Sequence, residues 1–268
     1  MPNYICQTCG AHYAEHSTPP RGCKICEDER QYVHREGQSW TTLTEATAKH
    51  DLVIRPMESN LYGIGIEPSF AIGQRALLLR SSQGNILWDC IPLINDQIIQ
   101  QIKKLGGLDM IAISHPHYYT GLSEWSKAFG GIPIYLHEDD REWVTRPDKN
   151  IVHWSGEQLS LLNELTLIRC GGHFDGGVVL HWPQGAEVKG VLLTGDIIQA
   201  IPDRRFVSFM YSYPNFIPLA VHAIQKIEKA VSPFSFDRIY SAWWDSCIDT
   251  DAKSVIERSV SRYIRAIS

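Results

Sequence analysis

Several features that would assign the chain to a common class are absent from its 268 residues. No segment approaches the roughly 20 consecutive apolar residues of a membrane-spanning helix, so we expect no membrane association. The 25 Lys and Arg do not outnumber the 30 Asp and Glu, and the net charge is −5. Because nucleic-acid binders carry basic surfaces, we expect no nucleic acid as a partner. The polar N-terminus has no apolar stretch typical of a secretory signal, which predicts a cytoplasmic protein.

The composition that remains is that of a globular protein with a sizeable core: 44% hydrophobic and 21% charged residues. The predicted compartment decides how the seven cysteines are interpreted. In a reducing cytoplasm thiols bind metal or stay reduced rather than forming disulfides.

The chain is predicted to divide into two parts of unequal size. Residues 1–30 hold paired cysteines and too few large apolar residues to fold alone, whereas residues 31–268 have the composition of one large domain. In the large part, early strands give way to strands that alternate with helices. This order predicts an α/β architecture with helices outside packed sheets.

Individual elements follow from apolar spacing and turn residues. Two apolar runs, Ala76–Leu79 and Ile86–Trp88, predict a hairpin with Gly84 and Asn85 in the turn. Further strands are expected at Asp109–Ser114, Ile132–Leu136, Thr166–Cys170, Gly177–Trp182, Gly190–Leu193 and Arg238–Ala242. Helices are expected at Asp96–Leu105, Gly121–Phe129, His137–Val144, Leu219–Ala230 and Asp251–Ala266.

Four cysteines form two C-x2-C pairs within the first 30 residues: Cys6, Cys9, Cys23 and Cys26. About 13 residues separate the pairs, close to the spacing of a zinc site. Each pair places two thiolates on one tight turn, and two such turns give the tetrahedral sulfur set that zinc prefers. We therefore predict a zinc knuckle whose metal supplies much of its folding free energy.

Iron is the alternative metal for this sulfur set, because tetrahedral thiolate sites suit either ion and the Cys-x2-Cys-Gly start resembles a rubredoxin knuckle. His12 and His16 lie between the pairs and could replace a sulfur. The remaining cysteines, Cys90, Cys170 and Cys247, lie in or beside strand-like runs and are interpreted as core or loop thiols.

A second set of candidate ligands follows the predicted strands of the large domain. His115 and His117 form an H-x-H at a strand end, which directs two imidazoles into one cleft. His173 lies in a glycine-rich loop between two strands, and Asp196 ends a buried run. Three histidines and one carboxylate are a suitable donor set for a catalytic metal with an open position.

These motifs, in their order along the chain, resemble those of the metallo-β-lactamase superfamily: Asp89 after a strand, His115-x-His117, His173 after paired glycines, and Asp196 in Thr-Gly-Asp. The resemblance covers about Glu67 to Ala242 and implies an αββα sandwich. It also implies a three-histidine metal site with Asp196 as a bridging carboxylate. Asp89 would be a buried residue that organises the metal-binding loops.

The chain departs from the superfamily pattern at the second metal site. The usual H-x-H-x-D-H motif has Tyr119 and Thr120 in its last two positions, and the usual late histidine is missing from Ser241–Asp245. We therefore expect one metal rather than two. The base would then be Asp196, Asp175 or Asp245, and Tyr119 could donate a hydrogen bond to an oxyanion.

Three functions compete at this point. The first is a zinc-dependent hydrolase of an ester, thioester or lactone-like bond in a small molecule. The second is a mononuclear iron oxygenase similar to the persulfide dioxygenases, because His115, His173 and Asp196 also form a 2-His-1-carboxylate set. The third is a non-catalytic binding protein with a degenerate site. The oligomeric state is left open by the sequence.

Overall fold

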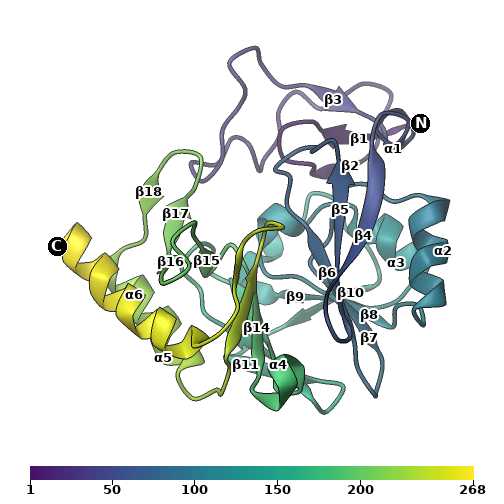
Figure 1. The fold of residues 1–268 in the computed structure, drawn as a ribbon. Coiled ribbons are helices and arrows are strands. Elements are labelled where there is room, and N and C mark those ends of the chain that lie inside the picture. Colours follow the sequence, from purple (N-terminus) through teal and green to yellow (C-terminus); the bar gives the residue numbers. More distant parts are fainter. The chain divides into compact units, whose positions relative to one another are not determined.

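The computed structural model describes all of residues 1–268, and its elements are drawn in Figure 1. The chain divides into two compact units: Met1–Leu136 with Arg141–His153, and His137–Asp140 with Trp154–Ser268. The predicted boundary at residue 30 falls inside the first unit and stays a prediction. None of the helices combines the length and the apolar character that crossing a membrane requires.

A seven-stranded sheet forms most of the first unit, in the order β10-β9-β8-β7-β6-β5-β4. Its strands are β4 (Asp51–Glu58), β5 (Leu61–Glu67), β6 (Ala76–Arg80), β7 (Asn85–Trp88), β8 (Met110–Ala112), β9 (Ile134–His137) and β10 (Ile151–Trp154). Neighbours from β4 to β7 are antiparallel, while β7, β8 and β9 are parallel. Parallel neighbours need crossover connections, which α2 (Asp96–Lys104) and α3 (Leu122–Ala128) provide.

The predicted elements of this unit are present, with two differences. Asn85 belongs to β7, where it pairs with Arg80, so the hairpin turn consists of residues 81–84 rather than Gly84 and Asn85. The stretch His137–Val144 forms a 3-10 helix, η2 (Glu138–Trp143), rather than an α-helix. Its first turn carries three consecutive acidic residues, and a run this short favours the tighter helix.

The N-terminal segment forms a small sheet of its own, in the order β2-β1-β3. Its strands are β1 (Asn3–Cys6), β2 (His12–Glu15) and β3 (Trp40–Thr41), and the short helix α1 (Leu43–Thr47) follows. The predicted knuckle therefore contains paired strands, since the turn after Cys6 reverses the chain. Strand β3 lies beyond residue 30 and pairs with β1, so the small sheet extends to Thr41.

The second unit is built on a six-stranded sheet, in the order β11-β12-β13-β14-β19-β20. Its strands are β11 (Gln158–Leu161), β12 (Leu165–Arg169), β13 (Val178–Trp182), β14 (Val191–Gly195), β19 (Arg238–Ser241) and β20 (Cys247–Ile248). Two short ribbons, β15 (Gln199–Ala200) with β16 (Val207–Ser208) and β17 (Met210–Ser212) with β18 (Ile217–Pro218), follow β14.

Three helices complete this unit: α4 (Gly185–Val188), α5 (Val221–Val231) and α6 (Ala252–Ile267). Helices α5 and α6 lie side by side in Figure 1. Their apolar residues, among them Ile227 and Ile256, share one buried cluster with Leu192 of β14 and Ile239 of β19. The strands and helices that the sequence predicts here are found within a few residues of their expected bounds.

Candidate functional site

Two groups of side chains in the structure could hold a metal ion. They are Cys6, Cys9, Cys23 and Cys26, and His115, His117, His173 and Asp196. Every member is buried, each offers one ligand atom, and within a group these atoms lie within 4.8 Å of one another. The structure thus groups all eight residues that the sequence singles out as metal ligands, while the identity of the metals stays a prediction.

Two tight turns present the four thiols. After β1, the Gly10 N–H donates to the Cys6 carbonyl at 2.8 Å, and Gly10 has a φ of +82°, which glycine adopts without strain. In the second turn, the Glu27 N–H donates to the Cys23 carbonyl at 2.9 Å. The sulfurs are 3.5 Å apart for Cys6 with Cys26, and 3.5 Å apart for Cys9 with Cys23.

These distances fit a tetrahedral metal. A zinc ion with Zn–S bonds of about 2.3 Å separates its sulfurs by roughly 3.8 Å. None of the four cysteines forms a disulfide in the structure. Hydrogen bonds from the Cys23 and Cys26 thiols hold the pKa of Cys6 well below its ordinary value, and Gln38 Nε2 also donates to its Sγ at 3.0 Å. Burial raises the pKa of Cys9 well above its ordinary value, so a bound cation is needed for all four sulfurs to be thiolates together.

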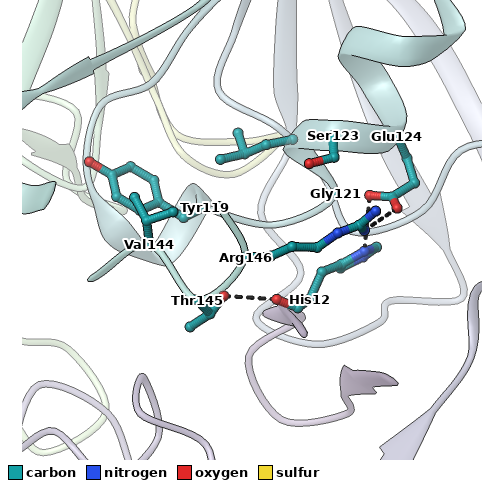
Figure 2. A pocket seen from close by; sticks show the side chains of 9 residues that line it. His12, Tyr119, Gly121, Ser123, Glu124, Val144, Thr145 and Arg146 are labelled. Atoms are coloured by element: carbon teal, nitrogen blue, oxygen red, sulfur yellow. Dashed lines mark hydrogen bonds and ion pairs between the residues drawn. The ribbon is translucent and has the colours of Figure 1, made fainter. Parts of the chain in front are cut away.

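His12 connects the N-terminal sheet to the rest of the first unit rather than to the sulfurs. It is buried, its Nε2 lies 2.8 Å from the Pro92 carbonyl oxygen, and its Nδ1 lies 3.2 Å from Glu124 Oε2. Arg146 binds the other oxygen of Glu124, and Thr145 Oγ1 donates to the His12 carbonyl at 2.8 Å. Figure 2 shows His12 and Arg146 converging on the Glu124 carboxylate.

The H-x-H segment is fixed by a buried carboxylate at its start. Asp89 Oδ1 accepts a hydrogen bond from the Ser114 N–H at 2.7 Å, and the Asp89 N–H donates to the Ala112 carbonyl at 2.8 Å. His115 follows at the N-cap of η1 (Pro116–Tyr118), with its Nδ1 2.8 Å from Ser114 Oγ. The His117 ring meets the His115 ring edge-on, with centroids 5.1 Å apart. Asp89 thus fixes the backbone directly before His115, and its role in organising the metal-binding loops stays a prediction.

Backbone and aromatic contacts orient the ligands of the second unit. His173 Nδ1 lies 3.0 Å from the Met210 carbonyl oxygen, which can only accept, so Nδ1 carries the proton and Nε2 the lone pair. The Tyr213 ring packs against His173 at 5.8 Å, and its hydroxyl donates to the Asp196 carbonyl at 2.9 Å. Burial, followed by the charge of Asp196, raises the pKa of Tyr213 well above its ordinary value, so the phenol stays protonated.

The donor set of this second group fits a catalytic zinc ion. Histidine ligands of zinc are oriented by hydrogen bonds from their other ring nitrogen, as Met210 orients His173. Three imidazoles and one carboxylate are ligands that zinc and iron both accept. The fit therefore supports a transition metal and leaves the choice of ion to experiment.

The positions that depart from the superfamily motif have other contacts. Thr120 is buried, and its hydroxyl donates to the Cys90 carbonyl at 3.2 Å. Tyr119 is also buried and lines a small pocket with His12 and Glu124, and in Figure 2 its hydroxyl points away from those side chains. The role of Tyr119 as an oxyanion donor stays a prediction.

A larger cavity of about 400 Å³ adjoins the ligands of the second unit. Its wall includes Met210 and Tyr213, the residues that contact His173 and Asp196, together with Trp243. Asp245, one of the predicted bases, also lines this cavity, whereas Asp175 is exposed and is not part of its wall. Trp243 thus occupies a wall position in the segment where the superfamily usually has its late histidine.

Sequence reasoning missed Tyr213 and Met210. Nothing distinguishes Tyr213 from the other ten tyrosines of the chain, and Met210 acts through its backbone carbonyl, which carries no sequence signal. Their ribbon, β17 with β18, is short enough to escape periodicity analysis.

Solved structures of metallo-β-lactamases share the architecture of the chain. DIM-1 metallo-β-lactamase aligns with a TM-score of 0.59 and 15% identity, over 81% of this chain and 99% of that one. A metallo-β-lactamase from Pontibacter korlensis gives 0.57 and 14%, over 79% and 98%. The mono-zinc form of FIM-1 from Pseudomonas aeruginosa gives 0.56 and 14%, over 79% and 95%. The chain therefore has the metallo-β-lactamase fold, and the predicted fold class is confirmed.

The sequence itself shows a nearer relationship. The chain is 50% identical over 270 residues to the uncharacterized protein YmaE of Bacillus subtilis (strain 168), covering 100% of this chain and 98% of YmaE. The chain belongs to the same protein family as YmaE. No model of a known protein family matches it.

Proposed function

We propose that the chain is a metal-dependent hydrolase that holds one zinc ion at His115, His117 and His173, with the Asp196 carboxylate beside that ion. Its substrate is a small molecule with an ester, thioester or lactone-like bond. The observation that carries the proposal is the grouping of three buried histidines and one buried carboxylate in a chain with the metallo-β-lactamase fold. Structural zinc sites are usually closed by four protein ligands, whereas catalytic zinc sites have three protein ligands and an open position. A set of three histidine ligands therefore favours catalysis.

In the reaction that we propose, the oxygen of water ends on the acyl carbon and the acyl C–O or C–S bond breaks. The proton passes to the leaving alcohol or thiol. If His115, His117 and His173 hold zinc, the ion would polarise the carbonyl and lower the pKa of water to about 7. Asp245 in the cavity wall and Asp196 are the candidate bases, and Tyr213 holds the Asp196 backbone in place.

A single ion at this site is supported by the residues around it. Thr120 directs its hydroxyl to a backbone carbonyl, and neither Thr120 nor Tyr119 belongs to the ligand group. The mono-zinc form of FIM-1 illustrates that this fold accommodates one zinc. We assign a second, structural zinc to the four cysteines, since four thiolates close the coordination shell.

Elemental analysis tests the metal assignment. We expect two zinc ions per chain in the wild type and one in a His115→Ala/His117→Ala variant. His222→Ala, which removes an exposed histidine of α5, is the matched control and should keep both. One metal per chain in all three proteins would leave the histidine group without an ion and favour the binding-protein interpretation. Iron in place of zinc would redirect the assay to oxygenase chemistry.

Turnover tests the reaction class. The zinc-loaded wild type should hydrolyse generic p-nitrophenyl esters or acyl thioesters, and His117→Ala should lose that activity by at least about a hundredfold. His222→Ala should keep it. Hydrolysis that persists in His117→Ala would show that the activity does not come from this site.

A further inference from the structure

The cavity beside His173 and Asp196 has the size and chemistry of a binding site for part of a small molecule. Its volume of about 400 Å³ lies within the range of ligand pockets, roughly 300–1,000 Å³. Apolar and aromatic side chains make up much of the wall, which includes Ile201, Pro202, Met210, Tyr213, Phe216 and Trp243. Such a lining favours an apolar ligand group, because burying that group removes apolar surface from water.

Two aromatic residues frame the cavity near the metal ligands. The rings of Tyr213 and Trp243 meet edge-on with centroids 6.1 Å apart, and the Tyr213 ring also packs on His173. A group that binds against Trp243 would therefore lie one aromatic ring away from a proposed metal ligand. This distance suits a substrate whose reacting carbonyl lies at the metal and whose side group fills the cavity.

Phe216 forms another part of the wall and is 84% exposed. It lies between β17 and β18 with a φ of +56°, in a backbone conformation that is uncommon for an aromatic residue. When a ligand covers an exposed aromatic side chain in a cavity wall, the apolar surface of that side chain is removed from water. Phe216 therefore adds contact area for a bound group without being needed in the core.

The two charged residues of the wall do not select a charged ligand. Arg204 donates to the Ile201 carbonyl at 2.8 Å and also to the Asp245 backbone carbonyl, so its guanidinium is already engaged. Asp245 adds a carboxylate to the same wall, and both residues are exposed. One positive and one negative group at solvent-exposed positions leave the cavity without a net charge to attract an ion.

We propose that this cavity binds an uncharged aryl or medium-chain acyl group of the substrate, with Trp243 and Phe216 as specificity-determining residues. The inference rests on the proposed function, because it takes the reacting bond to lie at the histidine group. It narrows the substrate class to neutral esters or thioesters with a bulky apolar acyl or aryl group. Small acetyl compounds and highly charged esters would be poor substrates.

Binding without turnover gives the first test. The probe is 4-phenylbutan-2-one, a neutral ketone with an aryl group and no bond to hydrolyse, titrated by ligand-observed NMR. Phe216→Ala and Trp243→Ala should each weaken its binding by about three- to tenfold, the usual contribution of an aromatic contact. Phe216→Ala changes an exposed side chain and should fold normally. Tyr32→Ala, an exposed tyrosine outside the cavity, should bind like the wild type.

Turnover of p-nitrophenyl esters from acetate to octanoate gives the second test. In the wild type, kcat/KM should rise with acyl length, and the rise should flatten in Trp243→Ala but not in Tyr32→Ala. Equal binding of the ketone to wild type and both cavity variants would overturn the proposal, as would a preference for acetate. If the ketone binds in the cavity but no ester is cleaved, the binding site stands and the proposed hydrolase function fails.

Discussion

Asp89 shows how one buried carboxylate can position a ligand-bearing loop. Its Oδ1 accepts the Ser114 N–H at 2.7 Å, directly before His115, and its backbone has a φ of +64°. Asp89→Ala would leave that N–H buried without this acceptor and place alanine at positive φ. We expect a loss of about 1.5–3 kcal/mol in the free energy of unfolding, measured by urea denaturation, and weaker zinc binding at the histidine group.

Asp89→Asn separates the hydrogen bond from the charge. Asparagine tolerates positive φ and keeps an oxygen that can accept from Ser114. This variant should therefore retain more than half of the stability that Asp89→Ala loses. Equal losses in the two variants would assign the effect to charge and not to the anchoring of the loop.

The pKa of Glu124 leads to a prediction about the stability of the fold in acid. Burial alone would raise its pKa, but the hydrogen bonds and charges of His12 and Arg146 outweigh burial and lower it to about 2. Because the folded-state pKa lies below the unfolded value of 4.5, this carboxylate stabilises the fold above pH 4.5. That contribution, at most about 3 kcal/mol, is lost as the pH falls from 4.5 towards 2.

Glu124→Gln should therefore unfold more easily than the wild type at neutral pH, and the gap should close in acid. Chemical denaturation between pH 2 and 7 measures this difference. Glu257→Gln, on an exposed position of α6, should follow the wild type throughout. A constant gap at all pH values would mean that Glu124 acts through packing and not through its charge.

Among the elements, the turn after β1 leaves little room for an added methyl group. A Cβ at Gly10 would lie 2.9 Å from Pro92 Cγ and 3.2 Å from Ala71 Cβ, in addition to the cost of its positive φ. We expect Gly10→Ala to lower stability by about 1–3 kcal/mol and to weaken metal binding by the cysteines. Thermal unfolding and a zinc competition assay measure the two effects.

Gly37→Ala provides the matched control. Gly37 has a φ of +92°, but a Cβ there would meet nothing within 4 Å. It should show only the backbone cost, about 1 kcal/mol. If the two variants lose equal stability, close packing of the turn against Pro92 is not what holds the N-terminal sheet.

The elements that the sequence predicted best are those with a strong local pattern. Helix α2 was predicted at Asp96–Leu105 from its apolar spacing, and the structure confirms it. There the Asn95 side chain caps the helix by accepting from the Ile98 N–H. Strand β20 and the strands of the ribbon β17–β18 are two or three residues long, and their formation depends on pairing with a neighbouring strand. No local pattern in the sequence therefore predicts them. The candidate metal ligands were predictable because Cys, His and Asp bind metals through their side chains, which the sequence shows directly. Contacts made by backbone carbonyls, such as that of Met210, were not.

For the whole molecule, we expect metal binding to raise the free energy of unfolding. A ligand that binds only the folded state adds about 2.7 kcal/mol when present at a hundred times its Kd. Zinc added to metal-free protein should therefore raise the Tm of the wild type by more than that of His115→Ala/His117→Ala or of Cys6→Ser/Cys26→Ser. Calorimetry of the three proteins measures the increments. An equal rise in all three would mean that zinc stabilises the fold through neither group.

The hydrogen bond between Thr145 and His12 joins residues 133 positions apart in the chain. A ribosome adds about 5–20 residues per second, so roughly 7–27 s separate the synthesis of these two residues. Until Thr145 is made, the N-terminal sheet lacks this contact. All four cysteines lie within the first 26 residues, so the complete sulfur group is synthesised long before it. Metal bound during synthesis would therefore shield the thiols from oxidation until the remainder of the unit is made.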